Sequence, residues 1–256
     1  MDGVVRLAGL IFASLLAAQV ARAEEITIDL PTGGSLKALV EVPSSIKSDR
    51  AIIYLHDAMI REVGTEKASE RGYDLGAHTK FYADSGYLAV SPIRKTPILS
   101  DNGDEVIEEG LSAILGAMAV IRNRNGGKST RVLVAGLGEG ALISLWALSQ
   151  MPDIAAGIII SPAGMAGRWT ASKAMSFEKF IDAQAARSIR SPVIIAIGAR
   201  ESLAARGRTD SLARALMSSY RQFRYVKNYP GNRQWFRHPQ PRMMGDIDTS
   251  LCSWWC

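Results

Sequence analysis

Residues 132–148 read VLVAGLGEGALISLWAL, and this stretch decides the fold. An apolar run is followed by glycines at 136, 138 and 140, and then by a second, longer apolar run. Glycine permits the backbone conformations and close approaches that a sharp turn needs. The stretch therefore predicts a strand over Arg131–Ala135, a turn over Gly136–Gly140 and a helix over Ala141–Met151.

Strand and helix signals alternate on both sides of this stretch. Glu25–Pro31 and Leu36–Val42 predict an antiparallel hairpin around Thr32-Gly33-Gly34. Further strands are expected at 51–56, 87–92, 154–161, 192–198 and 223–229, and helices at 74–85, 104–122, 177–189 and 211–220. This alternation predicts an α/β fold with a mainly parallel central sheet, helices on both faces and an N-terminal antiparallel hairpin. Chemistry is expected at the carboxyl ends of its strands.

The first 23 residues have the pattern of a secretory signal peptide. Arg6 precedes an apolar run of 14 residues, Leu7–Val20, and Ala21-Arg22-Ala23 is a small-x-small cleavage pattern. A bilayer-spanning helix needs about 20 residues, so the run is too short to be one. We predict a signal peptide over 1–23, a single domain over 24–256, and a periplasmic or secreted bacterial protein that is not transmembrane.

The composition excludes several classes of protein. Of 256 residues, 47% are hydrophobic and 21% are charged, which excludes a disordered chain. The two cysteines, Cys252 and Cys256, are too few for a disulfide scaffold or a four-cysteine zinc site. They form either a short local disulfide or a pair of tail thiols, and the sequence leaves both open.

The glycine-rich stretch, in this order of elements, resembles the nucleophile elbow G-x-S-x-G of the α/β-hydrolase superfamily, and the chain is most similar to its dienelactone-hydrolase and esterase branch. Other landmarks follow in the order of that family: Leu55-His56-Asp57, Ser161-Pro162-Ala163-Gly164, Ser191-Pro192-Val193 and Tyr229-Pro230-Gly231. The resemblance covers about residues 26–238. It implies an α/β-hydrolase fold with little or no cap domain, since only Gly164–Arg187 is available as a lid.

The same resemblance implies a Ser-His-Asp triad, and the sequence departs from it. Gly138 occupies the nucleophile position and has no side chain, whereas Glu201 fills the acid position. Gln234 stands where the histidine is expected, and His238, four residues later, would reach the site only if its loop bends back. The backbone N–H groups of Glu139 and Ala58 are the expected oxyanion donors.

Two functions follow from this departure. The first is an exported hydrolase-fold protein that is catalytically degenerate and binds a small-molecule ligand, an acyl ligand or a partner through the former active-site cleft. The alternative is an active hydrolase of ester or other acyl substrates, which uses an unorthodox nucleophile or a water activated by Glu201 or His238.

Competing interpretations of single motifs are weaker. GLGEGA also fits a dinucleotide fingerprint, but Ser161-Pro162 stands where an acidic ribose ligand is expected, so we expect no cofactor. Ser144 lies inside the predicted helix, and Ser161, at a strand end, is a better alternative nucleophile that is also explained as a turn residue. His56, His78 and His238 lack the spacing of metal ligands, so no metal is expected.

The net charge of +5 is unevenly distributed. Residues 185–256 contain 12 Lys and Arg against 4 Asp and Glu. This segment forms either a solvated basic face or a surface for an anionic partner or an anionic lipid surface. Residues 233–242, rich in Arg, Trp and Phe, are the sharper candidate for ligand contact. No nucleic-acid-binding motif accompanies the charge.

Overall fold

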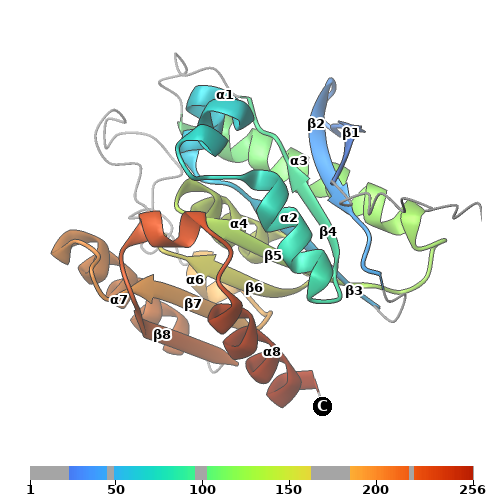
Figure 1. The fold of residues 1–256 in the computed structure, drawn as a ribbon. Coiled ribbons are helices and arrows are strands. Elements are labelled where there is room, and N and C mark those ends of the chain that lie inside the picture. Colours follow the sequence, from blue (N-terminus) through green and yellow to red (C-terminus); the bar gives the residue numbers. More distant parts are fainter. Residues whose placement is uncertain (1–22, 45–48, 96–102, 163–184, 219–221, 256) are drawn as a thin grey trace, which may run out of the picture.

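The computed structural model describes residues 23–44, 49–95, 103–162, 185–218 and 222–255, and contains an eight-stranded sheet flanked by helices (Figure 1). The strands are β1 (Glu24–Asp29), β2 (Ser35–Glu41), β3 (Arg50–Leu55), β4 (Leu88–Pro92), β5 (Arg131–Leu137), β6 (Ile154–Ile160), β7 (Val193–Gly198) and β8 (Phe223–Tyr229). The helices are α1 (Ala58–Glu70), α2 (Leu75–Asp84), α3 (Gly103–Arg124), α4 (Glu139–Gln150), α6 (Ala185–Ser188), α7 (Leu203–Met217), the 3-10 helix η1 (Arg233–Arg237) and α8 (Pro241–Trp255).

The sheet has the predicted mixed topology. Its strand order is β1-β2-β4-β3-β5-β6-β7-β8. β2 pairs antiparallel with β1 and with β4, whereas all later neighbours are parallel. The predicted fold class is therefore confirmed. Because β5 lies between β3 and β6, the loops that follow these three strands meet at one edge of the sheet.

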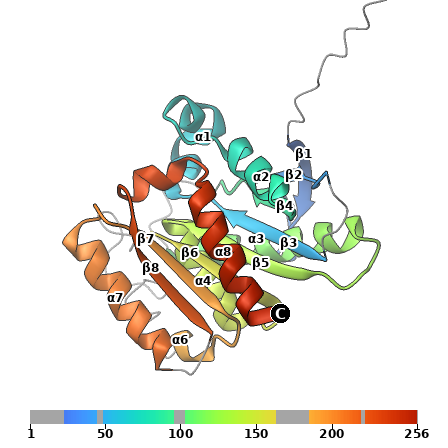
Figure 2. The same cartoon turned by 60° about the horizontal axis from the view of Figure 1, so that its bottom comes forward.

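The central strands are buried on both faces, which explains their nearly continuous apolar sequences. Side chains of a strand alternate between faces. In β3, Ile53 and Leu55 join a core formed with α3, α4, α6 and α7, whereas Ile52 and Tyr54 join a second core formed with α1, α2 and α8. Figure 2 shows α8 lying across the sheet on the side opposite α4.

Two predicted helices differ from the observed elements, and two observed helices were not predicted. The helix expected over 211–220 begins earlier, at Leu203, because the Ser202 hydroxyl caps its first turn by accepting from Ala205 N at 3.2 Å. Of the helix expected over 177–189, the structure describes only the part from residue 185, which contains α6. Helices α1 and α8 were not predicted. Most of the proposed lid, the signal segment over 1–22 and Cys256 lie outside the described residues.

Helix α8 closes the second core at the carboxyl end of the chain. It buries Met243, Met244 and Leu251 against the sheet. At its last turn, the indole of Trp255 lies 5.7 Å from the Arg50 guanidinium and 5.2 Å from that of Arg131, at the start of β3 and β5. Such cation–π contacts hold the tail against the opposite edge of the sheet from the elbow.

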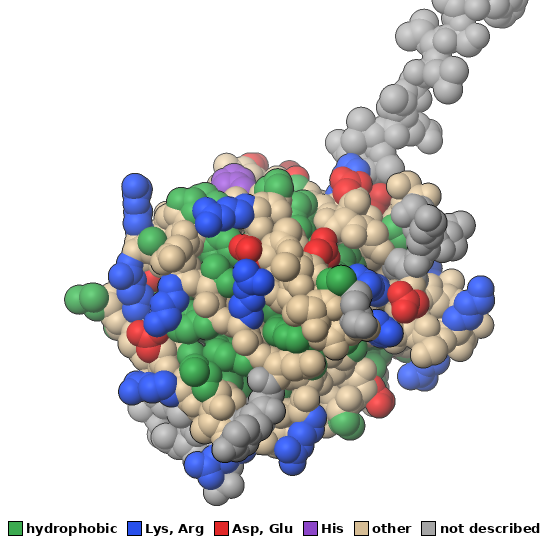
Figure 3. Space-filling model, turned by 90° about the horizontal axis from the view of Figure 1, so that it is seen from below, with side chains coloured by type: hydrophobic (Ala, Val, Ile, Leu, Met, Phe, Trp, Pro, Cys, Tyr) green, Lys and Arg blue, Asp and Glu red, His purple; other side chains and the backbone are tan. Residues whose placement is uncertain are grey.

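On one face of the molecule, the described basic side chains are dispersed and do not form a continuous patch (Figure 3). Figure 3 shows Lys and Arg spread over one face of the molecule, with acidic side chains among them. Within the described ranges, no helix has the length and apolar character needed to cross a membrane.

Candidate functional site

The turn between β5 and α4 has the backbone of a nucleophile elbow. Gly138 is its only residue outside the strand and the helix, with φ 59° and ψ −111°, a conformation that side-chain-bearing residues rarely adopt. A Cβ on Gly136 would lie 2.1 Å from the Gly140 carbonyl oxygen, so glycine is also needed where the helix packs on its own strand. The sharp strand–turn–helix geometry is therefore present without the side chain that it normally presents.

The space above Gly138 is filled by the carboxylate of Asp57. Asp57 lies two residues after β3 and is the N-cap of α1. A Cβ placed on Gly138 would lie only 2.3 Å from Asp57 Oδ1 and 2.8 Å from its Cγ. The Asp57 side chain, contributed by the segment between β3 and α1, thus occupies the place that a nucleophile on the elbow would take.

The same oxygen occupies the expected oxyanion hole. Ala58 N donates to Asp57 Oδ1 at 2.8 Å, and Glu139 N lies 3.4 Å from it. These are the two N–H groups that the sequence predicted as oxyanion donors, and the structure directs both at one internal carboxylate. Backbone N–H groups at two helix N-termini favour a negative charge at this point. The Asp57 carboxylate therefore occupies the oxyanion hole of this protein.

An arginine, rather than a histidine, approaches from the loop after β8. Arg233, at the start of η1, places its Nε 3.5 Å from Asp57 Oδ2, and its side chain is 39% exposed. Gln234, the residue at the expected histidine position, is exposed, and its N–H donates to Asn232 Oδ1 at 3.0 Å. Sequence reasoning missed Asp57 as a site residue, although it lies in the Leu55-His56-Asp57 landmark. Arg233 lies in the stretch 233–242 that the sequence offered for ligand contact, but its pairing with Asp57 was not predicted.

His238 does not join the acid position. It is exposed, and its ring lies beside Gly72, where a Cβ would come within 3.3 Å of His238 Cε1. Among the described residues, the His238 ring makes no hydrogen bond or ion pair. Glu201 instead accepts a hydrogen bond from Ser161 Oγ. The structure therefore pairs Glu201 with Ser161, and Asp57 with Arg233.

Ser161 has the second unusual backbone at this edge. It follows β6 directly and is the one described non-glycine residue with a positive φ, at 43°. Its N–H donates to Ala196 O at 2.7 Å, which holds it against β7. The neighbouring β6 residue, Ile160, accepts from Gly138 N at 3.0 Å, so the Ser161–Glu201 pair lies next to the elbow.

A buried ion cluster lies beneath the elbow. The Glu139 carboxylate accepts from Arg61 Nη2 at 2.8 Å and from Arg94 Nη1 at 2.8 Å. The three side chains are 5%, 3% and 0% exposed, respectively. Burial alone would raise the pKa of Glu139, but the attraction of Arg94 and the hydrogen bonds from Arg61 outweigh it and lower the pKa. Glu139 is therefore a buried carboxylate that balances two buried guanidinium groups.

His56 connects this cluster to Asp57. Its Nε2 accepts from Arg94 N at 3.1 Å, which leaves the proton on Nδ1 to be donated to Asp57 O at 2.9 Å. Burial, and then the charge of Arg94, lower the pKa of His56 to about 3. His56 is therefore neutral near pH 7 and fixes the backbone of Asp57.

His78 is also buried, on the other side of the same loop. Burial lowers its pKa to about 4, its ring stacks 4.8 Å from that of Tyr54, and its Nε2 bonds Arg237 O at 2.8 Å. It therefore ties α2 to η1. In the part of the chain that the structure describes, no group of three or more His, Cys, Asp and Glu could hold a metal ion.

The two buried histidines predict a loss of stability in mild acid. Their folded pKa values, about 3 and about 4, lie below the unfolded value of about 6.5, so the unfolded chain binds more protons as the pH falls from 7 to 5. Each histidine should lower the free energy of unfolding by about 2 kcal/mol over this interval. Urea unfolding at pH 7 and pH 5 measures the change, and His78→Gln should remove about half of it. An unfolding free energy that is the same at both pH values would contradict the assignment.

Comparison with solved structures identifies the fold family of the chain. No protein-family model and no curated protein matches the chain. An esterase from Pyrococcus furiosus superimposes with a TM-score of 0.67 at 14% identity, covering 91% of each chain. A putative dienelactone hydrolase from Klebsiella pneumoniae gives a TM-score of 0.61 at 18% identity, over 91% of this chain and 97% of that one. The protein has the α/β-hydrolase fold.

The hydrolase fold also occurs as part of longer chains. An acylaminoacyl peptidase from Pyrococcus horikoshii has a TM-score of 0.67 at 12% identity, and the match covers 90% of this chain and 41% of that one. At these identities the likeness establishes the architecture alone. The chemistry of this hydrolase-fold protein must be argued from its own residues, and at its elbow they are Gly138, Asp57 and Arg233.

Proposed function

We propose that this chain is an exported α/β-hydrolase-fold protein that does not hydrolyse acyl substrates and instead binds a ligand or partner at the face of the elbow. One observation carries the proposal: the Asp57 carboxylate fills the space above Gly138 and takes the N–H groups of Ala58 and Glu139. The site thus lacks both an attacking group on the elbow and a free oxyanion hole.

The magnitude of the two losses supports a non-hydrolytic function. Removing the nucleophile of a serine hydrolase lowers turnover by about a million-fold. The catalysis that survives such a loss comes from substrate binding and the oxyanion hole, in which a single donor contributes about a hundred-fold or more. Here a buried carboxylate competes for those donors, and its negative charge repels a developing oxyanion.

The Arg233 side chain indicates which chemical group the ligand carries. Its Nε lies 3.5 Å from Asp57 Oδ2 and its Cδ would lie 3.3 Å from a Cβ on Gly138, while the side chain remains 39% exposed. Guanidinium groups bind carboxylates and phosphates through paired N–H donors. We therefore propose an anionic group as the part of a small-molecule, acyl or protein ligand that is bound here. An anionic lipid surface is the other class that the Arg-rich carboxyl part of the chain fits.

Ester turnover tests this proposal. Purified protein comprising residues 24–256 should hydrolyse p-nitrophenyl acetate and p-nitrophenyl butyrate no faster than a matched Asp57→Asn variant or buffer. Its rate should also be unaffected by Glu201→Gln and His238→Gln. A rate above the buffer rate that is lost in Glu201→Gln or His238→Gln would contradict the non-hydrolytic function.

The Ser161–Glu201 hydrogen bond favours one alternative, an active ester hydrolase with Ser161 as nucleophile. A hydroxyl on a strained strand end, bonded to a carboxylate base, is the arrangement that nucleophilic catalysis requires. It lacks a histidine between the two groups. In the same assay this alternative predicts turnover that disappears in Ser161→Ala.

Export remains part of the proposal. Strand β1 begins at Glu24, directly after the Ala21-Arg22-Ala23 pattern, so cleavage there would leave the described sheet whole. Amino-terminal sequencing of the protein recovered from the periplasm or medium should begin at Glu24, and an uncleaved chain in the cytoplasm would contradict export.

A further inference from the structure

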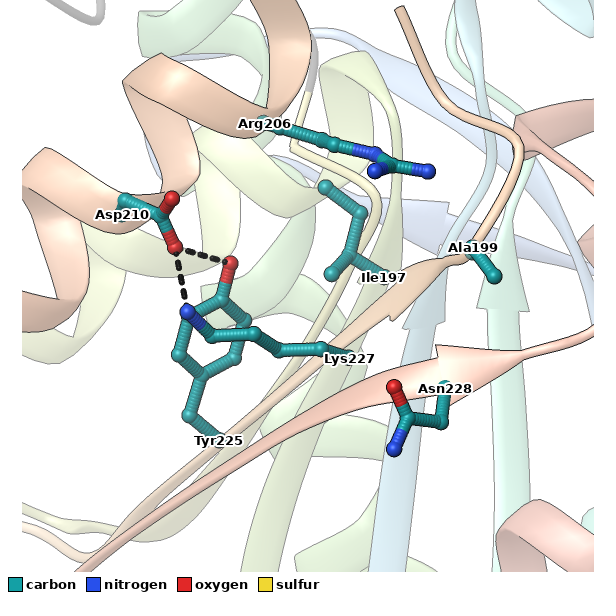
Figure 4. A pocket seen from close by; sticks show the side chains of 8 residues that line it. Ile197, Ala199, Arg206, Asp210, Tyr225, Lys227 and Asn228 are labelled. Atoms are coloured by element: carbon teal, nitrogen blue, oxygen red, sulfur yellow. Dashed lines mark hydrogen bonds and ion pairs between the residues drawn. The ribbon is translucent and has the colours of Figure 1, made fainter. Parts of the chain in front are cut away.

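A pocket between α7 and β8 lies apart from the elbow. It has a volume of about 320 Å³, at the lower end of the range for small-molecule sites. Its lining residues are Ile197, Gly198, Ala199, Arg206, Asp210, Tyr225, Lys227 and Asn228 (Figure 4). None of them belongs to the elbow site, so the pocket needs an explanation of its own.

Asp210, the acidic residue that lines this pocket, already bonds two side chains of β8. Asp210 Oδ1 accepts from Lys227 Nζ at 2.8 Å and from Tyr225 Oη at 3.0 Å. The hydrogen bond from Lys227, followed by that from Tyr225, lowers the pKa of Asp210. Asp210 is therefore an ionised carboxylate whose charge is balanced within the pocket.

Arg206 is left without such a partner. It precedes Asp210 by one helical turn, a spacing at which an ion pair commonly forms. Within the described residues, however, its side chain makes no hydrogen bond or ion pair. Figure 4 shows Arg206 extending from α7 over Ile197 toward Ala199, away from the Asp210–Lys227 pair. The pocket therefore presents an uncompensated guanidinium beside an apolar wall.

The position of Arg206 on its helix also favours a negatively charged ligand. It lies in the first turn of α7, which contains no acidic residue. The helix macrodipole makes this end positive, so a cation here is disfavoured and an anion is favoured. An anion bound to Arg206 would satisfy the guanidinium and the helix end together.

We propose that this pocket binds a small organic anion, a carboxylate or a phosphate monoester. Arg206 holds the anionic group, and Ile197 contacts the apolar part of the ligand. This inference is independent of whether the elbow hydrolyses esters, because no residue is shared.

Titration of the purified protein by two-dimensional amide NMR tests the site at constant ionic strength. Butyrate represents the carboxylate and phenyl phosphate the phosphate monoester. At least one should produce saturable shifts at the Gly198, Ala199 and Asn228 amides. Arg206→Gln should weaken that binding about tenfold or more, whereas Arg214→Gln, the same charge change two turns along α7, should leave it unchanged.

The titration separates a built site from general charge attraction. The dispersed amide spectrum of Arg206→Gln shows whether that variant is folded. The proposal is overturned if neither anion gives saturable shifts at these amides, if sodium chloride produces the same shifts, or if folded Arg206→Gln binds as tightly as the unmodified protein.

Discussion

Placing a serine at the elbow by Gly138→Ser should destabilise the protein by about 2–6 kcal/mol and yield no ester hydrolysis. The new Cβ would lie 2.3 Å from Asp57 Oδ1, a distance that forces the carboxylate or the turn to move. Overpacking of this kind costs about 1–3 kcal/mol, and a side chain at φ 59° and ψ −111° adds about 1–3 kcal/mol of backbone strain. The free energy of unfolding in urea measures the sum.

Two variants separate these causes. Gly126→Ser introduces a serine at nearly the same φ, 60°, where a Cβ meets nothing within 4 Å, so it should cost only the backbone part, about 1–2 kcal/mol. In a chain that already carries Asp57→Gly, the cost of Gly138→Ser should fall by about 1–3 kcal/mol, because the clashing group is gone. A Gly138→Ser cost no larger than that of Gly126→Ser would show that Asp57 does not occupy the nucleophile position.

Glu139→Gln should lower the free energy of unfolding by about 3–5 kcal/mol. The substitution preserves shape but removes the negative charge that faces Arg61 and Arg94, whose side chains are 3% and 0% exposed. Two buried guanidinium groups without a carboxylate carry the full cost of their desolvation. Urea unfolding at pH 7 measures the loss.

The matched control is Glu25→Gln. Glu25 also forms an ion pair, with Lys37, but the two side chains are 50% and 53% exposed, so water screens the attraction. Its removal should cost less than about 1 kcal/mol. Equal effects of the two substitutions would mean that the cluster beneath the elbow is no more important for stability than a surface pair.

The sheet could be predicted because its signals are local. The apolar run of β3, the turn at Gly33 and the glycines around Gly138 each identify their element without reference to the rest of the chain. Helix α1 escaped prediction because Gly64, with φ 82°, interrupts its helical pattern. Helix α8 was missed although its signals are also local: Pro241 stands at its first position, and Met243, Ile247 and Leu251 recur every four residues on one face.

The sequence predicts the backbone features of the site but not its side-chain contacts. The elbow, its missing side chain and the N–H groups of Ala58 and Glu139 follow from the order of motifs. The contacts that give the site its character join distant segments: Asp57 to Glu139, and Arg233 to Asp57. A sequence shows which side chains are available, whereas three-dimensional packing determines which of them reaches the vacant position above Gly138.

Covalent labelling is the most direct test of the central claim, that Asp57 occupies the place of the nucleophile and its oxyanion hole. A fluorophosphonate reports attack by an activated hydroxyl through a mass increase of the intact protein, and peptide mapping identifies the labelled residue. We predict no labelling of the unmodified protein, because Gly138 presents no hydroxyl. We also predict none of Gly138→Ser, because Asp57 takes the two N–H donors and no histidine activates the new hydroxyl. Stoichiometric labelling of the unmodified protein, at Ser161 or elsewhere, would contradict the account.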